Sequence, residues 1–268
     1  MQTLQSATEH YQRQQRINAR GLATARRLRS DPARLLAVVT AFQVAAAEDA
    51  AAAVPLMLSE QGIDTDMLAE PNPRALAGWS SSGWPMGTLL AKVSGPDVAE
   101  DVFDRFVLTQ YQDTARQSAA LTTGVTPTAT GYVRMLNPPS CSRCVILAGK
   151  WYRKNQGFQR HPNCDCRHIP SAEGGRDMRL SPEDYFDSLP RAEQDRVFTK
   201  NAAEILRRTE DHEQRQYLMG RLVNTRGGTR TSQRLDTKRR QMPETILARA
   251  GDDQAALLKQ LKAHRYIK

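Results

Sequence analysis

Apolar side chains in the first 125 residues recur at the spacing of an amphipathic helix. The segment Ser30-Asp31-Pro32 is a helix-start signal, because a serine or aspartate caps the first turn and a proline is tolerated at its first position. Four apolar residues then follow at i, i+3, i+4 and i+7, on one face of a helix that continues toward Met57. They are Leu35, Val38, Val39 and Phe42.

A second helix is predicted to begin near Pro96-Asp97 and to run toward Ala120. Between the two helices, residues 70–85 are rich in proline, serine and glycine, which is typical of a loop. We expect Trp79 and Trp84 to anchor this loop to the core or to a partner. The apolar stripe assigned to the second helix begins with Val98, Val102 and Phe106 and runs on through Tyr111.

The pattern changes after Pro127. Two short β-like segments, Tyr132–Leu136 and Lys150–Arg153, predict a hairpin. Helices resume at Ser181, which precedes a proline and an acidic residue and therefore predicts a capped first turn. The remaining helices are predicted from about Arg191 to Glu210, from Pro243 to Gly251 and from Asp252 onward.

All four cysteines lie in one short window, as Cys141-Ser-Arg-Cys144 and Cys164-Asp-Cys166. Two thiolate pairs can fill the tetrahedral shell of zinc without leaving an open position, and a reducing compartment favours metal binding over disulfides. We therefore predict a structural Zn²⁺ ion bound by Cys141, Cys144, Cys164 and Cys166, although four thiolates also suit iron. The second half of the site leaves alternatives open, in which His161 replaces Cys164 or His168 contributes a ligand.

These patterns predict a mainly α protein with a small zinc-clamped β-hairpin module, an α+β arrangement. We expect a helical N-terminal docking region in 1–125, a zinc-binding β module in 126–175 and a basic helical C-terminal region in 176–268. No charged and apolar leader opens the chain, and the longest apolar run, Leu35–Ala47, is too short to cross a bilayer. We therefore predict no membrane association.

The net charge of +9 is unevenly distributed. Residues 1–125 contain 11 basic and 13 acidic residues, whereas 176–268 contain 20 and 14. Near the C-terminus, seven basic residues accompany the single acid Asp236, and few aromatic residues are available to stack on bases. This composition predicts sequence-independent binding to DNA phosphates, with a solvated loop or pairing with acidic residues of a partner protein as the alternative. The seven are Arg221, Arg226, Arg230, Arg234, Lys238, Arg239 and Arg240.

The cysteine window resembles the signature of the phage Mu F-like minor head proteins, also called head morphogenesis proteins. The similarity rests on Asn137-Pro-Pro-Ser-Cys-Ser-Arg-Cys-Val-Ile-Leu-Ala-Gly149 and Arg160-His-Pro-Asn-Cys-Asp-Cys166. It extends over roughly 126–268 and includes the ending His264-Arg-Tyr-Ile267. One departure is Asp165, where the family more often has a basic residue. The resemblance implies that Cys141, Cys144, His161, Cys164 and Cys166 are the metal-region positions.

The same resemblance implies a low-copy minor capsid protein of a tailed phage, with a structural role in assembly and in DNA packaging or delivery. The implied partners are the portal protein, the major capsid protein and packaged DNA, which is bound without sequence specificity. The implied location is the virion, at the capsid interior or the portal vertex, after assembly in the host cytoplasm. We expect the helices of 1–125 to dock on the portal or the head wall.

A zinc-containing nuclease or toxin-like enzyme acting on nucleic acid is the alternative function. Such an enzyme needs a general base and a metal with an open coordination position. The chain has five histidines, and His212, between Asp211 and Glu213, is typical of a solvated helix end rather than of a base. We therefore expect no enzymatic activity.

Overall fold

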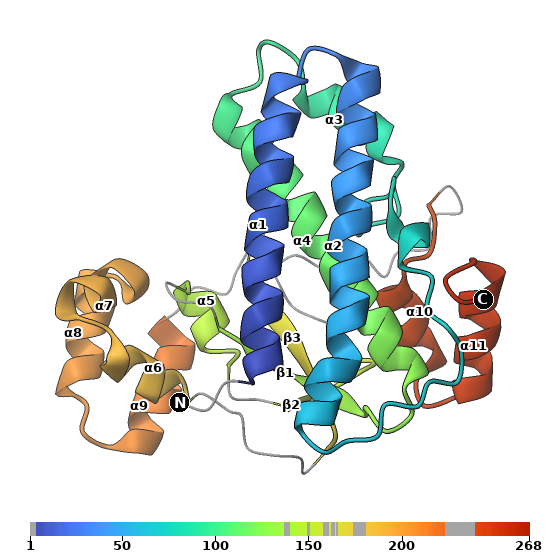
Figure 1. The fold of residues 1–268 in the computed structure, drawn as a ribbon. Coiled ribbons are helices and arrows are strands. Elements are labelled where there is room, and N and C mark those ends of the chain that lie inside the picture. Colours follow the sequence, from blue (N-terminus) through green and yellow to red (C-terminus); the bar gives the residue numbers. More distant parts are fainter. Residues whose placement is uncertain are drawn as a thin grey trace.

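The computed structural model describes residues 4–136, 140–148, 151–157, 161, 164, 166–173, 181–222 and 239–268. It confirms the predicted fold class, since a mainly helical chain carries one small antiparallel sheet (Figure 1). In chain order the described elements are α1 Gln5–Arg27, α2 Pro32–Glu60, the 3-10 helix η1 Pro73–Leu76, α3 Met86–Val93, α4 Glu100–Val125, β1 Gly131–Met135, α5 Ser142–Val145, β2 Trp151–Arg153, β3 Arg167–Ser171, α6 Pro182–Ser188, α7 Arg191–Phe198, α8 Lys200–Arg208, α9 His212–Leu222, α10 Pro243–Ala250 and α11 Gln254–Ala263.

Three long helices, α1, α2 and α4, form the body of the molecule (Figure 1). Helix α2 begins where the sequence predicts, and the Asp31 side chain accepts a hydrogen bond from the Arg34 backbone N–H at 3.1 Å. Helix α4 begins at Glu100, later than predicted, because the Arg29 guanidinium binds the carbonyls of residues 94, 95 and 98 and holds them in a turn. The predicted stripe was only partly correct: Tyr111 is buried and Phe106 packs against the core, whereas Val102 is exposed and Val98 precedes the helix. The buried apolar residues of this half of α4 are Phe103, Val107 and Tyr111.

A buried polar cluster joins α1 to α2. The Asp49 carboxylate lies 2.7 Å from His10 Nδ1 and accepts a hydrogen bond from Gln14 Nε2 at 2.8 Å. Burial acts to raise the pKa of Asp49, but the hydrogen bonds from His10, Arg13 and Gln14 outweigh it and lower the pKa to about 2. These contacts fix the register of the two helices.

Helix α2 is long and apolar enough to cross a membrane by length and composition. The prediction counted only the uninterrupted apolar run, whereas the helix continues past Glu48 and Asp49 to Glu60. Its buried residues form one stripe against α1 and α4, and a core helix that meets no membrane passes the same criterion.

The sheet has the order β2-β1-β3, with β1 paired antiparallel to both neighbours. The hairpin of β1 and β2 was predicted, apart from Lys150, which lies outside the described residues. Strand β3 was missed. Its sequence, Arg-His-Ile-Pro-Ser, has neither an alternation of apolar and polar residues nor a run of β-branched residues. All five positions are nevertheless buried.

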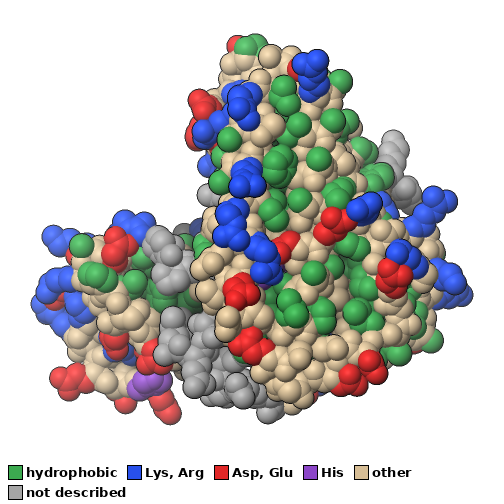
Figure 2. Space-filling model, in the orientation of Figure 1, with side chains coloured by type: hydrophobic (Ala, Val, Ile, Leu, Met, Phe, Trp, Pro, Cys, Tyr) green, Lys and Arg blue, Asp and Glu red, His purple; other side chains and the backbone are tan. Residues whose placement is uncertain are grey.

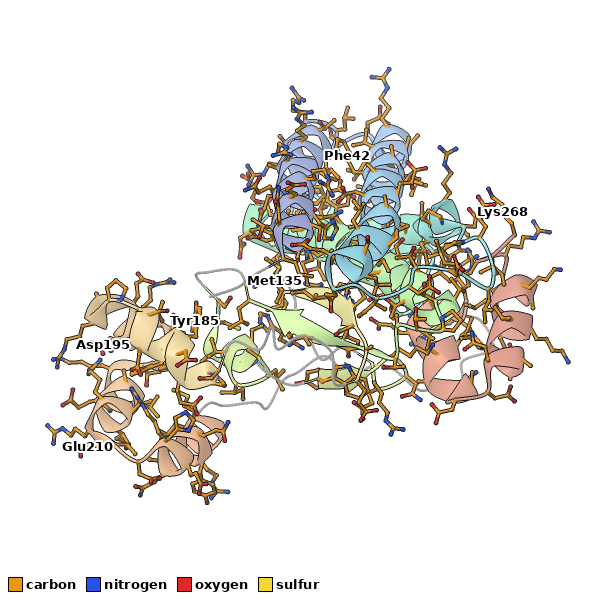
Figure 3. The ribbon with its side chains drawn as sticks, turned by 60° about the horizontal axis from the view of Figure 1, so that its bottom comes forward. Phe42, Met135, Tyr185, Asp195, Glu210 and Lys268 are labelled. Atoms are coloured by element: carbon orange, nitrogen blue, oxygen red, sulfur yellow. The ribbon has the colours of Figure 1, made fainter. Side chains whose placement is uncertain are left out.

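Helices α6 to α9 form a group beside the sheet, on the opposite side of the long helices from α10 and α11 (Figures 1 and 3). The Ser181 hydroxyl caps α6 by accepting from the Asp184 N–H at 3.0 Å, as predicted. The single helix predicted over 191–210 is instead two, because Thr199 adopts a φ of 69°, which breaks the helix between α7 and α8.

The predicted region 176–268 is divided between two cores. Its first part packs with the sheet module in a core that contains Tyr132, Cys166 and Phe186. Its last part packs on the N-terminal helices in a core that contains Leu121 and Leu261, among others. Residues of the predicted C-terminal region therefore contribute to both cores.

Candidate metal centre

The first half of the centre is a turn that opens the short helix α5. Cys141 has an extended backbone and precedes the helix, and the Cys144 N–H donates to the Cys141 carbonyl at 3.0 Å. Residues three apart in such a turn lie side by side, so both sulfur atoms point to the same region. Cys144 is buried and Cys141 is half-buried.

The other half of the centre comes from His161, Cys164 and Cys166. The Cys164 N–H donates to the His161 carbonyl at 3.0 Å, which holds these two residues close together. Cys166 directly precedes β3. These residues supply three further donor atoms.

The five side chains form two groups that share Cys144. Cys141, Cys144 and His161 have their ligand atoms within 4.8 Å of one another, and so do Cys144, Cys164 and Cys166. The Cys144 and Cys164 sulfur atoms are 3.4 Å apart, and His161 Nε2 lies 3.0 Å from Cys141 Sγ and 3.7 Å from Cys144 Sγ. Ligand atoms around a tetrahedral zinc stand roughly 3.5–3.8 Å apart, given bond lengths of about 2.3 Å to sulfur and 2.0 Å to nitrogen. The observed distances of 3.0 to 3.7 Å lie within or slightly below this range, so the donor atoms are close enough to bind one metal ion.

Hydrogen bonding within the cluster prepares thiolates. Hydrogen bonds with Cys144 lower the pKa of Cys141 to about 4 and also lower the pKa of Cys164 below the usual thiol range. The same contacts raise the pKa of Cys144. Because the thiolate is the form that binds metal, the cluster is poised to exchange its remaining protons for a cation.

Arg134 supplies a positive charge beside the sulfur atoms. It lies in the central strand β1 with only 3 % of its surface exposed, and its Nη1 is 3.9 Å from Cys144 Sγ. Burial acts to lower the pKa of Arg134, whereas attraction to Cys166, Cys144 and Cys164 raises it. The guanidinium therefore offsets the negative charge that thiolates bring into a buried site.

Arg116 of α4 holds the second half of the centre in place. Its Nε donates to the Cys166 carbonyl at 3.0 Å, and its Nη2 donates to the Cys164 carbonyl. Its Nη1 donates to Asp113 Oδ1 at 2.9 Å, and the arginine side chain is 1 % exposed. The planar fork of an arginine can reach two carbonyls on one edge of an extended segment, which the single ammonium of a lysine cannot do with the same geometry.

The sequence pointed to the five donor residues but to neither arginine. Basic residues were interpreted from the sequence as surface charge, and Arg116 and Arg134 lie 25 and 7 positions before Cys141. The only sequence signal for Arg116 is its place among buried positions of α4, and helical periodicity cannot show that. His168, the other predicted alternative, lies in β3 with its ring edge against Tyr132 at 4.4 Å between centroids, outside both ligand groups.

The predicted DNA-binding residues do not form one described surface. Arg226, Arg230, Arg234 and Lys238 lie outside the described residues, and Arg221 is exposed at the end of α9.

Arg239 and Arg240 instead contact the loop that carries the two tryptophans. The Arg239 guanidinium lies over Trp84, and Arg240 lies over Trp79 and Tyr266. Arg240 also donates to the carbonyls of residues 75 and 264, both at 2.7 Å. These contacts hold the C-terminal segment in place, and they also show that Trp79 and Trp84 anchor the loop to that segment.

Comparison with known proteins adds no relative: no family model, no curated protein and no solved structure matches this chain.

Proposed function

We propose that this chain is a structural, zinc-containing minor head protein of a tailed phage, with no catalytic role for its metal. The observation that carries the proposal is the cluster of five donors, which lies where the sequence resembles the head morphogenesis signature. Sulfur and imidazole ligands in tetrahedral spacing favour zinc among the common metals.

A structural role follows from the number of donors and their burial. A tetrahedral ion takes four ligands and the cluster offers five, so protein atoms can fill every position and leave none for water or substrate. Three of the four cysteines are buried, and Arg116 and Arg134 surround them. Such an ion would stabilise the junction of α5, β3 and α4 rather than activate a nucleophile.

The position of the centre supports a role in assembly. It lies where the sheet, the α6–α9 group and the long helices meet, so metal binding would order one part of the molecule against another (Figures 1 and 3). The proposed partners remain the portal protein, the major capsid protein and packaged DNA, and the proposed location is the capsid interior or portal vertex.

Elemental analysis of protein purified without added metal tests the metal. We expect near-equimolar zinc, which Cys144→Ser should remove because both ligand groups depend on that sulfur. His161→Ala and Cys166→Ala show which of the five donors the ion does not need. If a variant keeps its full zinc content, the replaced residue is not a required ligand. Protein that carries no stoichiometric metal under reducing conditions would contradict the proposal.

Quantitative mass spectrometry of purified virions and empty heads tests the location. We expect a low, fixed copy number in both particles. Absence from both would reject the head-protein role while leaving the metal result intact.

A further inference from the structure

The exposed face of helix α1 carries several arginines that form no ion pair among the described residues. The first 30 residues contain six arginines and one acid, Glu9. Four of these arginines follow one another at spacings of three, four and seven residues, which places them on one side of the helix. They are Arg13, Arg16, Arg20 and Arg27, and we refer to them as the α1 column.

The surface view shows the result. Lys and Arg side chains gather in a column along α1, in the same orientation as the ribbon (Figure 2). From Arg13 to Arg27 the column extends about 21 Å, at 1.5 Å per residue. The net charge of residues 1–125 did not indicate this column, because the acidic residues of that region lie on other segments and offset the arginines of α1 in the sum.

Most of the column has no ion-pair partner. Arg13 pairs with Asp49, but among the described residues no ion pair involves Arg16, Arg20 or Arg27. Arg27 makes a single hydrogen bond, to Thr24 at 3.5 Å. All three are exposed. Three of the four arginines of the α1 column therefore carry positive charge that no ion pair among the described residues offsets.

The exposed arginines of α7 and α8 differ from those of α1, because each pairs with an acid. On α7 and α8, Arg191 and Arg208 both pair with Glu204, at 3.2 and 2.8 Å, and Arg196 pairs with Glu193 at 2.5 Å. Arg191, Arg208 and Arg196 are exposed too, with side-chain exposures of 73, 79 and 57 %. Exposure alone thus does not explain the missing acids on α1.

We propose that the α1 column is a nucleic-acid-binding surface that contacts the phosphate backbone. Arginine and glutamine side chains are among the usual phosphate donors, and this face of α1 offers both types. It presents no large apolar side chain for a membrane or for the core of a protein interface. The exposed residues from Gln12 to Arg27 are Gln12, Gln15, Arg16, Ala19, Arg20, Ala23, Arg26 and Arg27.

This surface is independent of the metal centre and of the predicted basic segment near the C-terminus. It reads phosphates and not bases, because no exposed aromatic side chain stands on this face to stack. Binding should therefore be the same for unrelated sequences and should weaken steeply with salt.

The test compares two triple variants of the full-length protein on a labelled duplex DNA. Replacing Arg16, Arg20 and Arg27 with glutamine should reduce the slope of log affinity against log salt by about 2.7, at roughly 0.9 for each lost phosphate contact. At 0.1 M salt the affinity should fall by roughly 10²-fold.

The matched control removes the same charge from the ion-paired set, as Arg191→Gln, Arg196→Gln and Arg208→Gln. Its slope should change by less than about 1. The proposal is overturned if the wild type does not bind DNA, if the α1 variant keeps the wild-type slope, or if the control loses as much. Zinc content and helical circular dichroism of each variant establish that the fold and the metal centre are unchanged.

Discussion

Replacing Arg116 tests whether the long helix α4 positions the metal centre. Arg116→Met keeps an apolar stem of similar length but removes three hydrogen bonds, two to the carbonyls of Cys164 and Cys166 and one to Asp113. The change also removes the arginine charge from beside the buried Asp113 carboxylate. Removing one partner of a buried pair costs about 3–5 kcal/mol of the free energy of unfolding, and we expect a loss of that size.

The metal should respond as well. Groups that orient ligands from outside the coordination shell change metal affinity by about 10–100-fold, so zinc should pass to a competing chelator at correspondingly lower chelator concentration. Arg116→Lys keeps the positive charge but not the planar guanidinium. The free energy of unfolding should therefore fall by less, about 1–3 kcal/mol, and zinc binding should still weaken. The lysine variant also allows stability and zinc affinity to be measured if the methionine variant fails to fold.

The assays are urea unfolding of the zinc-loaded protein and chelator competition followed by a zinc-sensitive dye. The control is Arg105→Met on the same helix, where the side chain is 53 % exposed and lies 4.0 Å from Asp101, and it should change stability by less than about 0.5 kcal/mol. If Arg116→Met costs under about 1 kcal/mol and leaves zinc affinity unchanged, the arginine does not position the cysteines.

Three further predictions concern the body of the molecule and the metal. Cys144→Ser should abolish zinc binding in dialysis against free zinc, and retained stoichiometric zinc would contradict the shared-ligand geometry. Asp49 has a folded pKa of about 2, below its unfolded value, so its contribution of about 2 kcal/mol is present above pH 4 and is lost as pH falls toward 2. Asp49→Asn should flatten that part of the acid-unfolding curve, and an unchanged curve would refute the assignment. Gly21→Ala should lower the melting temperature although alanine has the better helix propensity, because the new Cβ would lie 2.6 Å from the Tyr111 ring and 2.9 Å from Phe42. Gly220→Ala is the control, since its Cβ would meet open space, and it should not lower the melting temperature.

The sequence alone determined the local features of this protein. The capped starts of α2 and α6, the hairpin of β1 and β2 and the five donors of the candidate metal centre all depend on residues close in the chain. Capping, turns and C-x-x-C spacing are short-range interactions, so their signals are complete within a few residues.

Only the tertiary structure decided how these pieces meet. From Gln110 onward α4 is buried on nearly all sides although its sequence is polar, because its side chains find partners on α2, as Ser118 does at the Ala47 carbonyl, 2.6 Å away. Strand β3 exists because β1 offers it an edge, not because of its own residues. Arg116 hydrogen-bonds to the carbonyls of Cys164 and Cys166, about 50 residues away in the chain. The α1 column is recognisable only once the fold shows which arginines pair with acids on neighbouring helices, as Arg26 does with Asp104. Such long-range pairings depend on which surfaces the fold brings together, and periodicity and composition carry no record of that choice.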